Sequence, residues 1–499
     1  MTTSTSAEKK FHNFIGGEWV PPSSGTYAPN RNPANTDDVI GQYPVSAKQD
    51  ALDAIAAAKD AFPAWSSMPA PARGRILWKA VDLFRARHED LARMLCREEG
   101  KTFAESKGEV GKGIHLLEFY AGEGFRMHGR TLPSEMKQTF TYTLRQPLGV
   151  VALITPWNFP FAIPVWKSAP ALVMGNTVVM KPASNTPGTA TMITELFQEA
   201  GVPKGVFNLV TGPGGAVGNT LVDHPEVKAV SFTGSNGVGL ALNERAAKRG
   251  IKVLCEMGGK NPVVVMDDAD LDLAISGILQ GAYGSTGQRC TATSRVVVQR
   301  GLKDKLTEAL VAGAQKIRVG NGMEAGIDMG PAVDESQLKT DLSYIDIGKG
   351  EGAKLLCGGE RITDGAFGKG YFVRPAVFGG VKVGMRLHQE EVFGPVISIV
   401  EVGDFEEALH AANAVEFGLS ASIYTRDANV AMKFVERSEV GMVHVNNPTV
   451  GGEAQLPFGG WKSTGVGGRE MAQEGGEFFT QLKTVFFDYT GAARTSKLY

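Results

Sequence analysis

The 499-residue sequence has few cysteines and no excess of charge of either sign. Its four cysteines, Cys96, Cys255, Cys290 and Cys357, form no Cys-x-x-Cys pair and have no histidine cluster beside them. This pattern argues against a structural zinc site and against the disulfide framework of a small secreted protein. Lys and Arg total 51 against 53 Asp and Glu, so a nucleic-acid-binding surface is not expected either. We therefore expect a protein without a metal ion or a nucleic-acid partner, in a reducing compartment.

Long apolar runs are also scarce. The first residues, MTTSTSAEKKFHNF, contain no apolar stretch of the kind found in secretory signals, so a cytoplasmic protein is expected. One uncharged window, residues 146–166, is long enough to cross a membrane, but it contains Pro147, Pro156, Pro160 and Pro164. Proline removes a helix hydrogen bond and clashes with the preceding turn. The window therefore predicts a buried strand followed by a loop, and no membrane partner is expected.

Glycine, in contrast, is abundant: 62 of the 499 residues are glycine, which is about 12%, whereas about 7% is typical. Between residues 149 and 257, short β-branched runs alternate with helical segments. This alternation predicts βαβ units on a parallel sheet, whose carboxyl edge commonly binds nucleotides. One helix should begin at Thr186 and Pro187 and end at Gly201. The predicted strands lie within residues 150–155, 176–182, 205–212, 228–234 and 251–259.

A second set of strands and helices follows residue 260 and predicts another α/β unit. Amphipathic helical segments precede residue 149, including residues 72–100, which end in Gly100. Residues 139–149 and 478–489 alternate apolar and polar side chains, as half-buried strands do. Because these two segments lie outside both α/β units, we expect them to form an edge sheet that pairs with another subunit.

Three residues stand in positions that suit covalent catalysis. Cys290 lies among small and polar residues, unlike a core cysteine, and a thiolate is the best side-chain nucleophile near neutral pH. The neighbouring Arg289 would favour the thiolate. Glu256 ends a predicted strand before a Gly-Gly turn, and Asn158 follows the first strand of the nucleotide-binding set. A lone cysteine in a loop is weak evidence for a nucleophile, so this assignment depends on the surrounding motifs.

Seven motifs, TPWNFP, MKPAS, FTGS, CEMGGKNP, GQRC, EEVFGP and PFGGWKSTG, occur in the order found in the aldehyde dehydrogenase superfamily, which this chain resembles from about residue 12 to 489. The resemblance implies an α/β fold with a Rossmann-type cofactor domain (residues 1–138 and 150–257). It also implies an α/β catalytic domain (residues 258–465) and a small β oligomerisation element (residues 139–149 and 478–499). The subunits would form a homo-oligomer, either a dimer or a tetramer.

The resemblance also implies catalytic roles. Cys290 would attack the aldehyde carbonyl, and the side-chain amide of Asn158 and the backbone N–H of Cys290 would hold the oxyanion. Glu256 would be the general base that activates water to hydrolyse the thioester. Members of the family that transfer the acyl group to coenzyme A lack an acidic residue at this position. Glu256 therefore favours release of a free carboxylic acid.

The cofactor implied by the resemblance is NAD or NADP. Gly234, Ser235 and Gly239 form a strand-to-helix turn where the backbone can approach a pyrophosphate. Ser184 stands where members strict for NAD commonly have a glutamate, and a serine could donate a hydrogen bond to a 2′-phosphate, so NADP should be accepted. Lys181 matches the lysine that contacts the adenosine ribose, and Glu391 and Phe393 match the residues at the nicotinamide. The expected cofactor site comprises Thr155, Pro156, Trp157, Lys181, Ser184, Gly234, Ser235, Gly239, Glu391 and Phe393.

The expected substrate tunnel comprises Phe159, Trp166, Arg289, Thr291 and Phe458, with Gly451 and Gly452 in the loop before the last of these. A fixed cation beside the tunnel suggests an aldehyde that carries a carboxylate. The alternative is that Arg289 points away into a structural ion pair.

Within the family, the chain most resembles bacterial 2-oxoglutarate semialdehyde (2,5-dioxopentanoate) dehydrogenases. Oxidation of such a carboxylated semialdehyde to the acid is therefore the expected function. Succinic semialdehyde and a broad range of aldehydes remain alternatives. Betaine aldehyde, acylation of coenzyme A and a catalytically silent structural role are the other possibilities.

Overall fold

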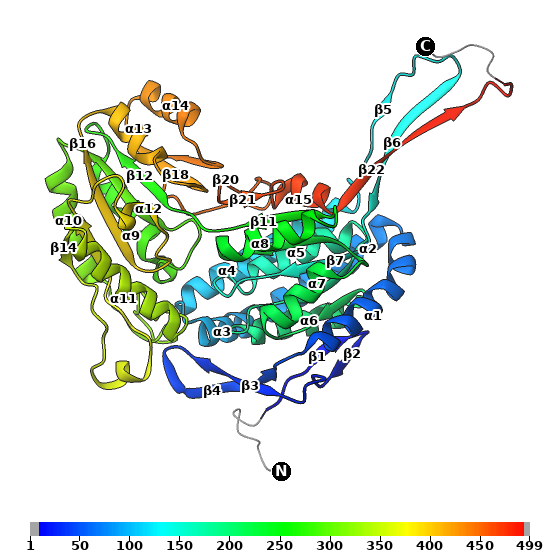
Figure 1. Cartoon of the computed structure of the whole chain (residues 1–499), viewed down its shortest axis with the longest axis horizontal. Coiled ribbons are helices and arrows are strands. Elements are labelled where there is room, and N and C mark those ends of the chain that lie inside the picture. Colours follow the sequence, from blue (N-terminus) through cyan, green and yellow to red (C-terminus); the bar gives the residue numbers. More distant parts are fainter. Residues whose placement is uncertain (1–8, 494–499) are drawn as a thin grey trace.

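The computed structural model of the chain describes residues 9–493, which form two α/β units and a projecting arm (Figure 1). An eight-stranded sheet has the order β2-β1-β9-β8-β7-β10-β11-β21, and a seven-stranded sheet has the order β14-β15-β16-β13-β12-β18-β19. Each sheet is packed between helices, as the alternation of strands and helices in the sequence predicts.

Five parallel strands form the centre of the first sheet: β7 (Val150–Ile154), β8 (Thr177–Lys181), β9 (Phe207–Leu209), β10 (Val227–Thr233) and β11 (Lys252–Glu256). Four of them lie within the predicted runs, and β10 begins one residue before its predicted run. The chain moves outward in one direction from β7 to β9 and then returns to the other side of β7 with β10. This Rossmann-type order leaves a crevice at the carboxyl ends of β7 and β10.

The side chains of β7 explain why both faces of this sheet are covered. Val151 and Leu153 belong to one core cluster, and Val150, Ala152 and Ile154 belong to another. Successive side chains of a strand point to opposite faces, so a continuous apolar run buries both. Helices α5 (Ala162–Val173) and α6 (Pro187–Ala200) contribute to the first cluster, and α1 (Lys48–Ser67) and α8 (Asn236–Ala247) to the second.

Two helical predictions for this unit have different outcomes. Helix α6 begins at Pro187 and ends at Gly201, which has a φ of 94°, as predicted. The uncharged window 146–166 contains strand β7 and a loop, but the prediction of a loop to its end is wrong because α5 begins at Ala162. Pro164 lies in the first turn of α5, where its missing N–H has no helical partner to lose. No helix within residues 9–493 is long and apolar enough to cross a membrane.

Six of the seven strands of the second sheet are parallel: β15, described next, and β12 (Asn261–Val265), β13 (Thr293–Gln299), β16 (Val396–Val402), β18 (Ser420–Tyr424) and β19 (Met442–Val445). Strand β15 (Ala376–Gly379) extends it and pairs with the antiparallel β14 (Lys354–Cys357). The sequence patterns did not predict β15 or helix α11. The helices of this unit are α9 (Leu271–Tyr283), α10 (Lys303–Lys316), α11 (Glu335–Gly350), α12 (Arg386–Gln389), α13 (Phe405–Asn413) and α14 (Ala428–Arg437).

The helical segment 72–100 is divided at Arg87 into α2 (Ala70–Ala86) and α3 (His88–Glu99), and Gly100 ends the second helix with a φ of 100°. Helix α4 (Phe103–Glu123) follows and packs on α2 and α5. The remaining elements are β1 (Asn13–Ile15), β2 (Glu18–Val20), β3 (Tyr27–Asn32), β4 (Asn35–Pro44), α7 (Asn219–Asp223), β17 (Phe417–Gly418), β20 (Trp461–Lys462), β21 (Gly465–Val466) and α15 (Ala472–Phe478).

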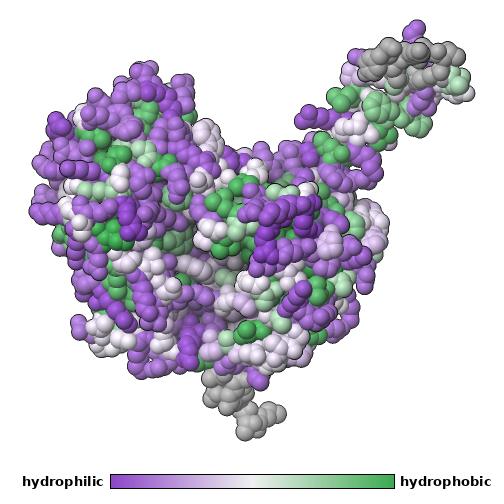
Figure 2. All heavy atoms as spheres, in the orientation of Figure 1, coloured by the Kyte–Doolittle hydropathy of each residue, from purple (hydrophilic) through white to green (hydrophobic). Residues whose placement is uncertain are grey.

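The arm is a three-stranded sheet that projects from the body (Figure 1). Strand β6 (Thr139–Pro147) pairs with β22 (Thr480–Asp488) along its whole length, and β5 (Thr131–Leu132) lies on the other side of β6. The two segments predicted to form an edge sheet thus pair with each other. Hydrophobic residues are exposed along the arm (Figure 2). Its contact with another subunit, and the boundaries of the predicted domains, stay predictions.

Two glycines in α8 have different surroundings, and this difference gives a stability test. A Cβ at Gly239 would lie 2.5 Å from Met257 Sδ and 3.1 Å from the ring of Phe232, whereas a Cβ at Gly237 would meet no atom within 4 Å. Gly239→Ala should therefore destabilise the protein by about 1 kcal/mol or more, because α8 or its neighbours must move. The measurement is the thermal unfolding midpoint at one fixed protein concentration without cofactor.

Gly237→Ala is the matched control and should not lower the midpoint, because alanine favours a helix over glycine. Equal midpoints for the two variants would show that α8 is not closely packed at Gly239.

Candidate active site

The loop that carries Cys290 has a strained backbone. Ser285, Thr286 and Gly287 follow one another with φ values of 50°, 59° and 68°. A non-glycine residue in this conformation costs on the order of 1–3 kcal/mol and persists only where its surroundings hold it. The N–H of Ser285 donates to Glu105 over 2.6 Å, and the hydroxyl of Thr286 donates to the carbonyl of Gly330 over 3.0 Å. These contacts fix the direction in which the chain enters Cys290.

Two cavities meet at Cys290, the one residue that lines both. The first has a volume of about 270 Å³ and the second about 230 Å³. A group bound in one cavity would therefore approach the sulfur from a different side than a group bound in the other.

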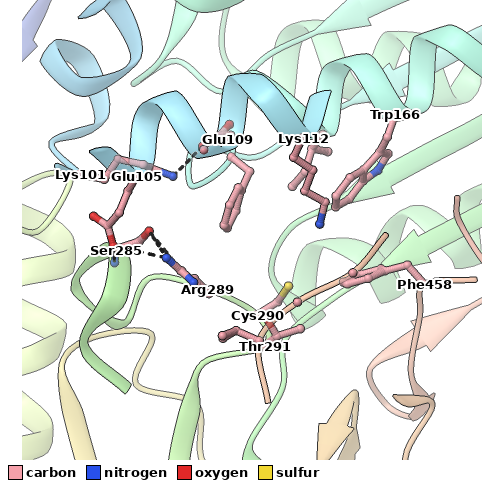
Figure 3. A pocket seen from close by; sticks show the side chains of 16 residues that line it. Lys101, Glu105, Glu109, Lys112, Trp166, Ser285, Arg289, Cys290, Thr291 and Phe458 are labelled. Atoms are coloured by element: carbon pink, nitrogen blue, oxygen red, sulfur yellow. Dashed lines mark hydrogen bonds and ion pairs between the residues drawn. The ribbon is translucent and has the colours of Figure 1, made fainter. Parts of the chain in front are cut away.

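The first cavity contains all five residues predicted for the substrate tunnel, Phe159, Trp166, Arg289, Thr291 and Phe458. Figure 3 labels the last four of them. Val450, Gly451 and Gly452 complete the wall from the loop before Phe458. The ring of Trp166 lies 5.4 Å from the ring of Phe458. The cavity thus has apolar sides and is wide enough for a small aliphatic molecule.

The second cavity lies at the carboxyl ends of β7 and β10, at the crevice that the strand order creates. Six of the ten residues predicted for the cofactor line it, namely Pro156, Trp157, Gly234, Ser235, Glu391 and Phe393. Asn158 lines it as well. Gly234 and Ser235 form the turn that leads into α8, so backbone N–H groups at the helix start face the place where a phosphate would bind.

The rest of the second cavity also fits a dinucleotide. Glu391 accepts a hydrogen bond from the N–H of Gly259 over 2.8 Å, and a Cβ at Gly258 would lie only 2.3 Å from its other oxygen. Burial raises the pKa of Glu391 to about 7. Phe393 has a φ of 60°, which orients its ring edge-on to Trp157 at 5.4 Å. A glycine backbone, a carboxylate acceptor and an aromatic ring suit a ribose and a flat base.

Four predicted cofactor residues do not line this cavity: Thr155, Lys181, Ser184 and Gly239. Lys181 ends β8 at the same sheet edge and donates to the carbonyl of Pro182 over 2.9 Å, and burial lowers its pKa to about 8. The hydroxyl of Ser184 donates to the carbonyl of Gly212 over 3.3 Å. Gly239 allows α8 to pack closely against Met257 and Phe232. The roles of these residues toward a cofactor stay predictions.

Sequence reasoning missed several wall residues. Gln337, at the start of α11, lines the second cavity and donates to the carbonyl of Val392 over 3.1 Å. Glu105, Glu109 and Lys112 line the first cavity from α4. Their spacing places them on one face of a helix, which is the signal that could have found them. A charged helix face is usually exposed to solvent, so this spacing more readily predicts a solvent-exposed face than a cavity wall.

Two of the three cations in the first cavity have a carboxylate partner. Lys101 Nζ lies 2.7 Å from Glu109, and Arg289 lies 3.3 Å from Glu105. Arg289 also donates to the hydroxyl of Ser285 over 3.0 Å. Both sequence-based alternatives for Arg289 therefore hold in part, because it lines the cavity while its guanidinium is held in an ion pair. The remaining cation is Lys112.

Burial and the carboxylates of Glu391 and Glu256 raise the pKa of Cys290 to about 12, and Lys112 and the N–H of Thr291 oppose this shift. The expectation that Arg289 is the cation that favours the thiolate is not supported, since its guanidinium is directed to Ser285 and Glu105.

Asn158 and Glu256 are both buried; Asn158 lines the second cavity with Cys290, whereas Glu256 lines neither cavity. The amide nitrogen of Asn158 donates one hydrogen to the carbonyl of Gln288 over 3.0 Å, which leaves its second hydrogen for another acceptor. Burial and the nearby carboxylate of Glu470 raise the pKa of Glu256 well above its usual value, and Lys167 and Arg469 oppose the shift. Glu256 is thus a stronger base than an exposed carboxylate.

The comparisons with known proteins agree with this geometry. The model of the aldehyde dehydrogenase family matches residues 19–485, so the chain belongs to the aldehyde dehydrogenase family. An alpha-ketoglutaric semialdehyde dehydrogenase of Bacillus subtilis (strain 168) is 47% identical over 479 residues, which cover 96% of this chain and 98% of that protein. A 2,5-dioxopentanoate dehydrogenase of Saccharolobus solfataricus is 44% identical over 480 residues, covering 96% and 99% of the two chains.

Among solved structures, the betaine aldehyde dehydrogenase of Staphylococcus aureus in complex with NAD+ superimposes with a TM-score of 0.95. It is 36% identical and the match covers 98% of this chain and 97% of that chain. The predicted aldehyde-dehydrogenase fold, with its Rossmann-type and catalytic α/β parts, is confirmed. The protein is an NAD(P)-dependent aldehyde dehydrogenase, as predicted.

Proposed function

We propose that the protein oxidises 2-oxoglutarate semialdehyde, or a closely related carboxylated semialdehyde, to the free carboxylic acid. The observation that carries the reaction type is the meeting of two cavities at Cys290, because an aldehyde and a hydride acceptor must reach the same carbon from different sides. Two relatives named for this substrate, and the cations of the first cavity, support the substrate class. The same cations disfavour a quaternary ammonium aldehyde.

In this proposal Cys290, as the thiolate, forms a bond to the aldehyde carbon. The second amide hydrogen of Asn158 and the N–H of Cys290 stabilise the oxyanion of the thiohemiacetal. NAD or NADP, when bound, accepts the hydride, and Gly234, Ser235, Glu391 and Phe393 would hold it in the second cavity. Acceptance of NADP is supported by the absence of a carboxylate at Ser184.

Glu256 then takes a proton from the water that hydrolyses the thioester. Burial raises its pKa, so its ionised carboxylate is a stronger base than an exposed one. Collapse of the tetrahedral intermediate breaks the carbon–sulfur bond, releases the free acid and returns Cys290 to the thiolate, and Glu256 then loses its proton to water. Transfer to coenzyme A needs no such base at this position, so Glu256 supports hydrolysis.

We also propose a cytoplasmic homo-oligomer. The four cysteines, all within the described residues, are free thiols, as suits a reducing compartment. Both faces of the arm carry exposed apolar side chains, Leu482 and Phe486 on one face and Phe140, Leu144 and Phe487 on the other. Such a surface on a projecting sheet supports a contact with another subunit.

The substrate assignment is tested by kcat/KM for 2-oxoglutarate semialdehyde, succinic semialdehyde and pentanal, each with NAD and with NADP. The carboxylated aldehydes should be preferred by about a hundredfold, or roughly 2.7 kcal/mol, which is the size of a charge-assisted contact. Equal values for pentanal would contradict the substrate class and leave a broad-specificity enzyme.

Glu256→Gln should slow thioester hydrolysis while hydride transfer continues. A rapid burst of reduced cofactor, followed by a steady-state rate lowered by about a hundredfold or more, is expected in stopped-flow absorbance. Because the pKa of Glu256 is raised, its base form grows as pH rises, so wild-type kcat should increase with pH and the variant should lose this dependence. Cys290→Ser, which lacks the proposed nucleophile, is the control and should show no burst. An unchanged steady-state rate in Glu256→Gln would remove Glu256 from the mechanism.

The arm contact is tested by sedimentation velocity. Leu482→Asp together with Phe486→Asp should shift the protein to a smaller species, because two buried carboxylates would disfavour an apolar interface. Met432→Asp, an exposed apolar position on α14, is the matched control and should leave the sedimentation coefficient unchanged. An unaltered distribution in the arm variant would place the interface elsewhere.

A further inference from the structure

Lys112 on α4 is the cation of the substrate cavity that has no charged partner. Its ammonium points into the cavity on the side of Cys290 and Trp166 (Figure 3). Within residues 9–493 it forms no ion pair and no hydrogen bond, and the face of the Trp166 ring lies 5.5 Å away. Burial lowers the pKa of Lys112.

The other charges of the cavity wall are compensated in pairs. Lys101 is paired with Glu109, and Arg289 with Glu105. The wall therefore carries one unbalanced positive charge, on Lys112. A cation removed from water without a partner is unfavourable, so its environment favours the arrival of an anion.

The position of Lys112 also suits the far end of a bound aldehyde. Lys112 lines both the substrate cavity and the surface hollow that adjoins it, so its side chain lies along the entrance, with the ammonium directed inward. When the carbonyl carbon of a substrate is at Cys290, the other end of that substrate extends toward this entrance. A molecule with a carboxylate at that end would bring the charge to Lys112.

Gly452 leaves the space that such a contact needs. A Cβ at this position would lie 3.3 Å from Lys112 Nζ and 3.9 Å from the ring of Phe458. Even an alanine at position 452 would crowd the ammonium of Lys112. The glycine thus keeps one side of the cation open.

We infer that Lys112, and not Arg289, pairs with the carboxylate of the substrate and sets the preference for carboxylated aldehydes. This inference rests on the proposed function. An ammonium has three donors and no fixed plane, so it can bind the carboxylate and the adjacent keto oxygen of a 2-oxo acid together. Arg289 supports the wall from its ion pair with Glu105 and contacts the acyl chain at most.

The test compares Lys112→Met with Lys107→Met. Lys107 is an exposed lysine of the same helix outside the cavity, so its loss gives the same change in net charge. Lys112→Met should raise KM for 2-oxoglutarate semialdehyde and lower kcat/KM about 30-fold to 100-fold, with kcat changed much less. For pentanal, kcat/KM should fall much less, and only because loss of the Lys112 charge raises the pKa of Cys290. Lys107→Met should match the wild type on both aldehydes.

Two further measurements separate a binding role from a structural one. Lys112→Arg keeps the charge and should recover much of the preference that Lys112→Met loses. Glutarate, which has the carboxylate but no aldehyde, should inhibit the wild type competitively and should inhibit Lys112→Met at least about tenfold more weakly.

The outcomes distinguish this inference from the proposed function. A wild type that prefers carboxylated aldehydes, together with a Lys112→Met variant that keeps the preference, would overturn the inference and leave the proposed function standing. A wild type without any preference would overturn both. If Lys112→Met does not fold, the inhibition constant of glutarate for Lys112→Gln decides in the same way.

Discussion

The relative position of Cys290 and Asn158 depends on two carboxylates of one helix. Glu105 accepts a hydrogen bond from Ser285 in the loop before Cys290, over 2.6 Å. One turn later on α4, Glu109 accepts from the N–H groups of Phe161 and Ala162, over 2.9 and 3.1 Å, at the end of the loop that carries Asn158. The helix thus holds the loops of Cys290 and Asn158 by their backbones.

Lys101 completes this network. Its ammonium donates to Glu109 and, over 2.6 Å, to the carbonyl of Asn158, so the charge of Glu109 is balanced where it is buried. A buried ion pair contributes little to stability by itself, but breaking it leaves an uncompensated charge. The network therefore ties the geometry of the site to the integrity of α4.

Much of the fold could be predicted from the sequence, and the proposed reacting groups could be named from its motifs. The strands of the first sheet are continuous apolar runs because both faces are covered, and Cys290, Glu256 and Asn158 lie in motifs that mark the family. The environment of these groups could not be predicted in the same way. Whether Arg289 faces Glu105 or a substrate depends on how α4 packs against a loop about 180 residues later in the chain. The same packing turns Lys112 inward, although its sequence neighbourhood is that of a solvated helix face.

The pairing of β6 with β22 has a consequence for the order in which the molecule forms. Strand β6 precedes the parallel sheet in the chain, but its partner, residues 480–488, follows both α/β units. During synthesis the amino-terminal parts fold first, and contacts between distant segments form late. Strand β6 therefore has an unpaired edge on the β22 side until residues 480–488 have left the ribosome, and the arm closes only after both units are made. Oligomers that form through the arm can therefore assemble only after residues 480–488 are made. By then the residues of the active site have already been synthesised.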